Sequence, residues 1–260
     1  MRIITLNVNG IRAAAQKGLF HWLSQQHADI VCLQEVRAQQ QQLMTDLFYP
    51  HGYYCYYHDA VKKGYSGVAL YSRWQPQMVF LGLGWPWVDQ EARYLEARFA
   101  QLSVVSLYLP SGTSGDERQA FKMELLEKLM PYLQTLRQQK REYILCGDWN
   151  IAHQPIDLKN WRSNQKHSGF LPEERAWLDE LLGPMGFVDA FRVVNQAAEQ
   201  YTWWSHRGRA WDNNTGWRID YQITTPGLKA TIHQAHIYKQ TRFSDHAPLS
   251  IDYHLDKLAP

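Results

Sequence analysis

Short runs of apolar residues, separated by polar stretches, recur along this 260-residue chain. Runs of this length that are rich in Val, Ile, Leu and Tyr are typical of buried strands. We therefore predict strands over 2–8, 28–35, 67–72, 102–110, 142–150 and 218–223. The run "EYILCGDWN" ends on two polar side chains, Asp148 and Asn150, and their purpose needs an explanation.

Three further segments place apolar residues at three- and four-residue steps, which is the spacing of amphipathic helices. They span 18–28, 116–141 and 171–183. In the second, acidic residues come first and basic residues last, as the helix dipole favours, and we expect Pro131 to kink or divide it. Strands and helices with no linker or short repeat between them predict a single α/β domain over residues 1–260, with two sheets of mixed strands.

Composition changes this picture little. Hydrophobic residues make up 45% of the chain and charged residues 20%, and the formal net charge of +2 neither requires nor excludes nucleic-acid binding. The cysteines Cys32, Cys55 and Cys146 form no thiol framework, and two of them lie in strand-like runs, so we interpret them as small buried side chains in a reducing compartment. The chain shows neither a signal peptide nor an apolar run long enough to span a bilayer, so we expect a cytoplasmic protein without membrane association.

Polar side chains stand at the ends of several predicted strands. A buried charge without a partner is costly, and ligands of α/β sheets bind at the carboxyl ends of strands. Any one of these residues could be a turn or cap residue, but their number indicates one shared polar site. They are Asn7, Asn9, Glu35, Tyr108, Ser111, Asp148, Asn150, Asp220, Asp245 and His246.

The residue types in this set indicate a particular chemistry. Carboxylate and amide oxygens suit Mg²⁺ or Mn²⁺ better than zinc, and no cysteines are spaced to compete. A carboxylate such as Asp148 beside the cation can take a proton from water, and an imidazole such as His246, held by Asp220, can donate hydrogen bonds to a phosphoryl oxygen. Together these groups are suited to phosphodiester hydrolysis.

Several blocks of the sequence resemble the exonuclease III family of apurinic/apyrimidinic (AP) endonucleases, within the endonuclease/exonuclease/phosphatase superfamily. They are "LNVNGIRA", "LQE", "GDWNIAHQPIDLKN", "GFLPEER", "DAFR", "GWRIDYQI" and "SDHAPL", in the family's order, from Met1 to about Tyr253. The resemblance implies a four-layer α/β sandwich, in which two mixed β-sheets pack face to face between layers of helices. It also implies a monomeric DNA repair hydrolase that uses Mg²⁺, with Mn²⁺ able to substitute, on double-stranded DNA with abasic sites or with damaged or blocked 3′ ends.

The resemblance also implies roles for individual residues. Tyr108 matches a residue that contacts the scissile phosphate, Asp148 the residue that activates water, and Asn150 an amide that stabilises the transition state. Asp220 and His246 match a carboxylate–histidine pair at the phosphate. The metal site is predicted from Asn7, Glu35, Asp148, Asn150, Asp245 and His246.

The substrate side of the site matches the DNA-processing branch of the family. Trp203, Trp217 and Ile219 match the small apolar pocket that receives the base-free sugar. Ser111 stands where the family usually has an amide, and its hydroxyl has a shorter reach. His167, in "KHSGF", is bulkier than the small or amide residues common in this loop, although it could be an ordinary solvated loop histidine.

Our functional hypothesis depends on His167. An internal abasic sugar must be flipped out of the duplex into the pocket, whereas a terminal 3′ group needs less room. A narrowed entrance predicts 3′-phosphatase, 3′-phosphodiesterase or 3′→5′ exonuclease activity, with weak or absent cleavage at internal abasic sites.

Three alternatives remain open at this point. The first is a full AP endonuclease. The second is a non-catalytic regulator of the catabolite repression control type, which "SGTSGDE" and "RFSDHAPL" also resemble, although such a protein has no reason to keep the whole catalytic set. The third is a phosphatase for lipid or small-molecule phosphates.

Overall fold

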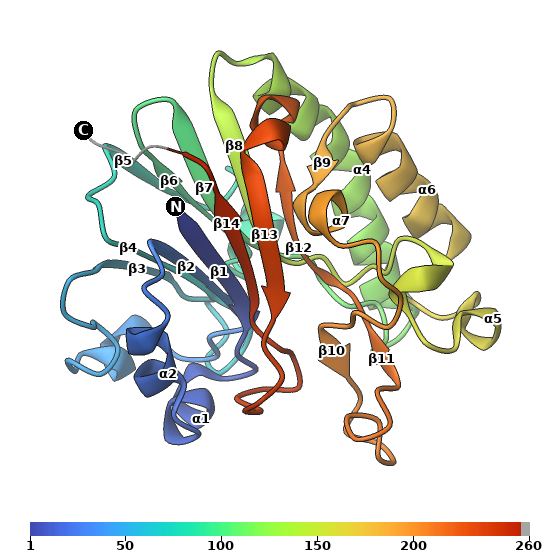
Figure 1. The fold of residues 1–260 in the computed structure, drawn as a ribbon, viewed down its shortest axis with the longest axis horizontal. Helices are drawn as coiled ribbons and strands as arrows, with labels where there is room; N and C mark the ends of the chain where they lie inside the picture. Colours follow the sequence, from blue (N-terminus) through green and yellow to red (C-terminus); the bar gives the residue numbers. More distant parts are fainter. Residues whose placement is uncertain (256–260) are drawn as a thin grey trace.

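The computed structural model describes residues 1–255, within which two six-stranded sheets pack face to face (Figure 1). The first sheet runs in the order β13 (Ile232–Ile237), β14 (Leu249–Tyr253), β1 (Arg2–Asn7), β2 (Ile30–Gln34), β4 (Val68–Ser72) and β3 (Tyr54–His58). The second runs in the order β5 (Met78–Leu81), β6 (Tyr94–Arg98), β7 (Leu102–Tyr108), β8 (Glu142–Asp148), β12 (Asp220–Thr224) and β9 (Val188–Asp189). A separate hairpin pairs β10 (Trp203–Trp204) with β11 (Gly216–Trp217).

Both sheets are mixed, as predicted. Strand β1 is parallel to β2, and β7 is parallel to β8, while the other ladders in the two sheets are antiparallel. The parallel pairs are central in their sheets, so the carboxyl ends of four neighbouring strands point to the same edge of the sandwich.

Helices cover the outer face of each sheet and complete the four-layer sandwich (Figure 1). The helices α1 (Ile11–Gln16) and α2 (Leu19–Gln25) pack on the first sheet, and α4 (Asp116–Gln138) and α6 (Pro172–Leu182) pack on the second. Shorter helices are α3 (Pro86–Asp89), α5 (Trp161–Asn164) and α7 (Ala190–Val194), and 3₁₀ turns span Gln40–Leu43, Pro155–Asp157 and Pro226–Thr231.

The alternation of side chains along the strands explains the layers. Ile3 and Ile144 belong to the core between the sheets, whereas their neighbours Ile4 and Leu145 belong to the cores under the helices. Both faces of the central strands are therefore buried, which is why their sequences read as continuous apolar runs.

Pro131 does not divide its helix. Helix α4 is continuous across it, and Pro131 is exposed, so the carbonyl that loses its hydrogen-bond donor faces solvent on the outer side. Within residues 1–255 no helix is long and apolar enough to cross a membrane.

Candidate active site

The strand ends that the sequence marked as polar meet at one edge of the sandwich. In the second sheet, Asp148 at the end of β8 stands beside Tyr108 at the end of β7 and opposite Asp220 at the start of β12. In the first sheet, Asn7 ends β1 beside Gln34, and Glu35 follows directly. The parallel central strands of both sheets thus deliver their last side chains to a common place.

Asn7 joins the two sheets at this edge. Its Nδ2 donates to Glu35 Oε2 at 2.9 Å and to Asp148 Oδ2 at 2.8 Å, while its Oδ1 accepts the backbone N–H of Asn9 at 2.9 Å. The amide nitrogen therefore lies between two carboxylates that would otherwise repel each other. In this arrangement Asn7 organises the acidic groups, and its own oxygen is directed at the backbone.

Asp220, His246 and Asp148 form a buried chain of charged groups. His246 Nδ1 lies 2.9 Å from Asp220 Oδ2, and His246 Nε2 lies 3.8 Å from Asp148 Oδ2. Burial by itself lowers the pKa of His246, but the negative charges of Asp220 and Asp148 outweigh it and raise the pKa well above its ordinary range. Burial raises the pKa of Asp148, and the charge of Asp220 raises it further, while His246 opposes them. His246 is thus held as a proton donor beside a carboxylate that binds protons readily.

Asp245 is in the opposite electrostatic situation. Burial raises its pKa, but the charge of His246 and hydrogen bonds from Asn9, Trp203 and Ser244 outweigh this and lower the pKa to about 2. Asn9 Nδ2 donates to Asp245 Oδ1 at 2.9 Å, and Trp203 Nε1 donates to Asp245 Oδ2 at 3.1 Å. Asp245 therefore keeps its negative charge at the rim of the site.

The backbone around these residues is unusual. A Cβ at Gly147 would lie 1.8 Å from the carbonyl oxygen of Leu107, so only glycine allows β7 and β8 to approach so closely before Asp148. Glu35 and Asn150 adopt positive φ angles of 56° and 51°, which are costly for residues with a side chain. Asn150 is held there because its N–H donates to Asp148 Oδ1 at 2.9 Å and its Nδ2 donates to Leu109 O at 2.8 Å.

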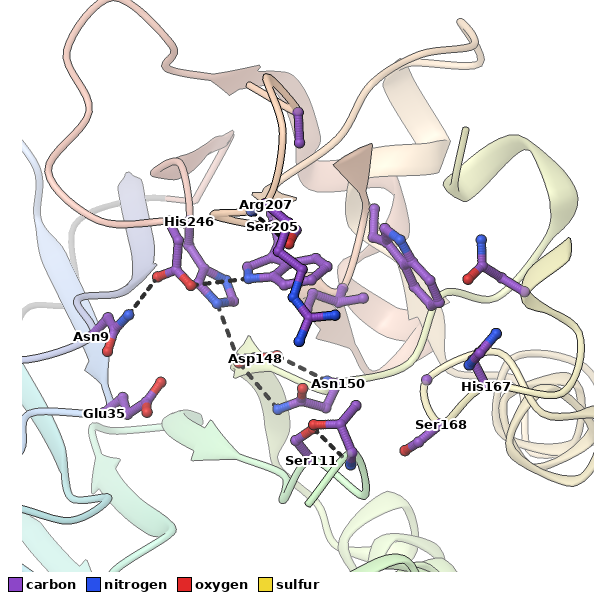
Figure 2. Close-up of a pocket in the computed structure, with 18 of the residues that line it drawn as sticks. Asn9, Glu35, Ser111, Asp148, Asn150, His167, Ser168, Ser205, Arg207 and His246 are labelled. Carbon is purple, nitrogen blue, oxygen red and sulfur yellow. Dashed lines mark hydrogen bonds and ion pairs between the residues drawn. The ribbon is translucent and has the colours of Figure 1, made fainter. Parts of the chain in front are cut away.

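A cavity of about 610 Å³ opens directly over this polar edge (Figure 2). Of the predicted site residues, only Asn7 and Asp220 do not line it, because both are fully buried behind it. The predicted residues that line it are Glu35, Tyr108, Ser111, Asp148, Asn150, His167, Trp203, Trp217, Ile219, Asp245 and His246.

One wall of the cavity is apolar and contains the three residues that the family resemblance assigns to a sugar pocket. Trp203 and Trp217 pair across the β10–β11 hairpin with their rings edge to face at 6.3 Å between centroids. Phe170 meets Trp217 in the same manner at 6.4 Å, and Ile219 is packed with them. Trp204 instead lies in the core between the sheets.

Ser111 and His167 line the cavity from two loops that lie beside each other. Ser168, next to His167, accepts the backbone N–H of Gly112 at 3.1 Å. In Figure 2 His167 and Ser168 stand on the side of the cavity away from Asn9 and Glu35. His167 is exposed to solvent and also lines the cavity, so its position is compatible with either interpretation of this residue and does not choose between them.

Asn9, named among the polar residues at the strand ends but given no role, also lines the cavity. Other lining residues were not predicted as site residues. Arg37 forms an ion pair with Glu35, and Arg207 reaches the cavity from the β10–β11 loop, which no sequence pattern placed there. Thr113 and Ser205 complete the polar rim.

Comparison with known proteins identifies the family. The model of the family described as "Endonuclease/Exonuclease/phosphatase family" matches residues 4–246 of this chain. The chain belongs to this family. An exodeoxyribonuclease of Bacillus subtilis (strain 168) is 43% identical over 96% of this chain and 98% of its own length, and a DNA repair nuclease APEX1 of Danio rerio is 36% identical over 96% and 81%.

Solved structures of the family share the fold. An AP endonuclease from Archaeoglobus fulgidus superimposes with a TM-score of 0.88 at 29% identity, covering 98% of this chain and 100% of that chain. A 3′-5′ exonuclease (NExo) from Neisseria meningitidis gives a TM-score of 0.89 at 26% identity, covering 97% and 99%. Within the endonuclease/exonuclease/phosphatase family, this chain is therefore a phosphodiester hydrolase, a DNA repair nuclease of the exonuclease III/AP endonuclease type.

The donor atoms at the site fit the divalent cation on which the family depends. Glu35, Asp148 and Asp245 bring three carboxylates to one cavity, and no cysteine lies among its lining residues. One ligand atom each of Asp148, Asp220 and His246 also lie within 4.8 Å of one another, which is close enough to bind a common ion. Because His246 Nδ1 already pairs with Asp220 Oδ2 at 2.9 Å, Nε2 is the one ring nitrogen left to face a phosphoryl oxygen or an ion. Oxygen donors of this kind suit a hard cation.

Proposed function

We propose that this chain is a divalent-metal-dependent phosphodiesterase of DNA repair that processes 3′ ends in double-stranded DNA and cleaves internal abasic sites weakly or not at all. The observation that carries the proposal is the position of His167, an exposed side chain that lines the same cavity as Asp148, Asn150 and His246. Among its structural relatives is a 3′ phosphatase, NExo, from Neisseria, bound to a product DNA hairpin, at 25% identity and a TM-score of 0.88.

The metal ion in this proposal is Mg²⁺, with Mn²⁺ able to replace it. The residues that would hold it, directly or through water, are Asn7, Glu35, Asp148, Asn150 and Asp245. A bound Mg²⁺ ion supplies positive charge that neutralises the phosphate oxygens and the developing alkoxide. His246 stays outside this set in its hydrogen-bonding role.

The remaining chemistry belongs to the side chains. Asp148, with its raised pKa, accepts the proton of the attacking water as the new P–O bond forms and the bond from phosphorus to the DNA 3′ oxygen breaks. His246, held protonated by Asp220, donates a hydrogen bond to the phosphoryl oxygen that gains charge. Tyr108 and the Asn150 amide line the same cavity and would contact the phosphate oxygens, and the leaving 3′ oxygen takes a proton from solvent water.

The preference for ends over internal sites follows from the shape of the entrance. Trp203, Trp217 and Ile219 form an apolar wall suited to a base-free sugar. His167 and Ser111 stand on the loops that border it. A flipped internal sugar carries a DNA strand on both sides and must pass His167, whereas a 3′-terminal group is free on one side.

Replacing His167 by Gly or Ala tests this proposal. We expect the rate on a duplex with an internal abasic site to rise about tenfold relative to the rate on a nicked 3′-phosphate duplex, which corresponds to about 1.4 kcal/mol in the barrier. Gln165→Ala, in the same exposed loop but outside the cavity, serves as the matched control. An unchanged ratio of the two rates in both His167 variants would show that the histidine does not restrict the entrance.

A full AP endonuclease is the second candidate, and the similarity to solved AP endonucleases favours it. It predicts that the parent protein cleaves the abasic duplex as fast as it removes the 3′-phosphate. The assay above therefore separates the two candidates before any variant is made. A cytoplasmic location and a monomeric state remain predictions from the sequence.

A further inference from the structure

Helices α4 and α6 are joined by a fully buried ion pair under the candidate active site. Lys122 Nζ lies 2.6 Å from Glu174 Oε1, and both side chains have no exposed surface. Taking two charges out of water is expensive, and a pair of apolar side chains of similar size would often stabilise a protein as well. Stability alone therefore does not account for this ion pair. The groups that Lys122 and Glu174 contact indicate a second role.

Lys122 contacts the loop that carries Asn150. Its Nζ donates to the backbone carbonyl oxygen of Asn150 at 2.8 Å. Asn150 has a positive φ angle, so its backbone needs such external support to stay in place. Lys122 thus reaches the backbone of a residue that lines the cavity without entering the cavity itself.

Glu174 holds the loop that carries His167. Its Oε2 accepts the backbone N–H of Gly169 at 2.6 Å and that of Leu171 at 3.1 Å, and its Oε1 accepts Gln119 Nε2 at 3.1 Å. The residue between those two amides, Phe170, donates its own N–H to the carbonyl oxygen of His167 at 3.0 Å. This one carboxylate therefore contributes two of the hydrogen bonds that hold the segment following His167.

The two loops are also tied to each other through their backbones. The N–H of Ala152 donates to the carbonyl oxygen of Gly169 at 2.8 Å. Lys122 and Glu174 sit at the junction of these loops, and burial lowers the pKa of Lys122 while Glu174 opposes that shift. Removing either charge would leave the other buried and would release one of the two loops.

We propose that Lys122 and Glu174 are a positioning pair, which sets the Asn150 amide against the reacting phosphate and fixes the His167 loop at the cavity entrance. The first effect serves the hydrolytic step on every substrate. The second effect adds a structural cause to the proposed preference for 3′ ends, and this part of the inference rests on that proposed function. Neither residue touches the substrate, since neither lines the cavity.

The test is Glu174→Gln, compared with Glu96→Gln. Glu96 is also a buried carboxylate, which accepts hydrogen bonds from Arg98 at 2.6 Å and Ser103 at 2.8 Å, but it lies on β6 and outside the cavity. Both variants lose a buried charge with its partners, so both lower the free energy of unfolding. For each, kcat and KM are measured with Mg²⁺ on the 3′-phosphate duplex and on the abasic duplex, at a temperature where each variant is fully folded.

Glu174→Gln should lower kcat on the 3′-phosphate duplex by about tenfold with little change in KM, because misplacing a catalytic group by a fraction of an ångström has effects of this order. It should also raise the abasic to 3′-phosphate rate ratio, and this rise should disappear when His167 is already Gly. Glu96→Gln should change neither quantity. If Glu174→Gln does not fold, Lys122→Met/Glu174→Gln, which leaves no charge buried, gives the same comparison.

Two outcomes separate this inference from the proposed function. If His167→Gly raises the rate ratio but Glu174→Gln behaves like Glu96→Gln in kcat and in ratio, the positioning role is wrong and the proposed function stands. If His167→Gly leaves the ratio unchanged, the proposed preference for 3′ ends fails. The positioning of Asn150 is then tested by kcat alone: it stands if kcat falls in Glu174→Gln and not in Glu96→Gln, and it is wrong if the two variants behave alike.

Discussion

The buried carboxylate of Asp157 offers a quantitative test of how the apolar wall of the cavity is supported. Asp157 Oδ1 accepts Arg218 Nε at 2.8 Å and Arg192 Nη2 at 2.6 Å, and Arg218 lies between the two pocket residues Trp217 and Ile219 in the chain. Burial raises the pKa of Asp157, but the two arginines outweigh it and lower the pKa to about 2, against an ordinary value of 3.8. At about 1.4 kcal/mol per pKa unit, this difference corresponds to about 2 kcal/mol of stability.

The sign of the pH dependence follows from the direction of the shift. Because the folded protein binds this proton less tightly than the unfolded chain, the stabilisation is complete above pH 3.8 and is lost as the pH falls through about 2. We expect Asp157→Asn to lower the free energy of unfolding at pH 7 by about 2 kcal/mol, and the gap between parent and variant to shrink to about half of that at pH 3.

Urea denaturation at a series of pH values measures this gap directly. Asp252→Asn is the matched control, because Asp252 pairs with Arg2 at the surface, where a salt bridge contributes about 1 kcal/mol or less. A gap between parent and Asp157→Asn that stays constant from pH 7 to pH 3 would refute the reasoning, since the loss would then come from packing and not from the charge of Asp157.

Three further predictions concern the site and the core. Asp220→Asn should lower kcat about 10²-fold with a smaller effect on KM, because His246 loses the charge that keeps it protonated; steady-state kinetics on the 3′-phosphate duplex measures this. A chelator should abolish hydrolysis and added Mg²⁺ should restore it and raise the melting temperature, because the cation relieves repulsion among the carboxylates; an unshifted melting temperature would contradict a site at this edge. Leu129→Ala, in the core under α4, should lower the free energy of unfolding by about 2–5 kcal/mol in urea denaturation and leave KM unchanged.

The parallel central strands of each sheet could be predicted from the sequence, whereas other strands were missed, among them the interior strands β6 and β14. Strands such as β8, buried on both faces, read as unbroken apolar runs, and their bounds agree with the prediction to within two residues. Strand β3 was missed because it is an edge strand, "YCYYH", with exposed and half-buried positions that give no clear period. Strands β10 and β11 have two residues each, which is too short for any pattern to mark them.

The candidate site was predictable where chemistry coincides with the end of a strand. Asp148 and Asn150 stand out because polar residues directly after an apolar run are unexpected in a core. The approach of Arg207 to the cavity was not predictable, because it depends on the path of a loop, and a charged loop residue in a sequence reads as solvated.

Lys122 shows why the supporting residues of a site are harder to predict than the site itself. It is the first buried position of α4, ahead of the apolar positions that pack on the second sheet, so in the sequence it reads as a charged residue before the hydrophobic stripe begins. A lysine at such a position predicts an exposed side chain, since buried lysines occur only with a partner. Its partner Glu174 lies 52 residues away and is likewise an ordinary charged residue in the first turn of α6. Only the fold brings the two charges together, and their hydrogen bonds to the loops of Asn150 and Gly169 are what connects them to the candidate site.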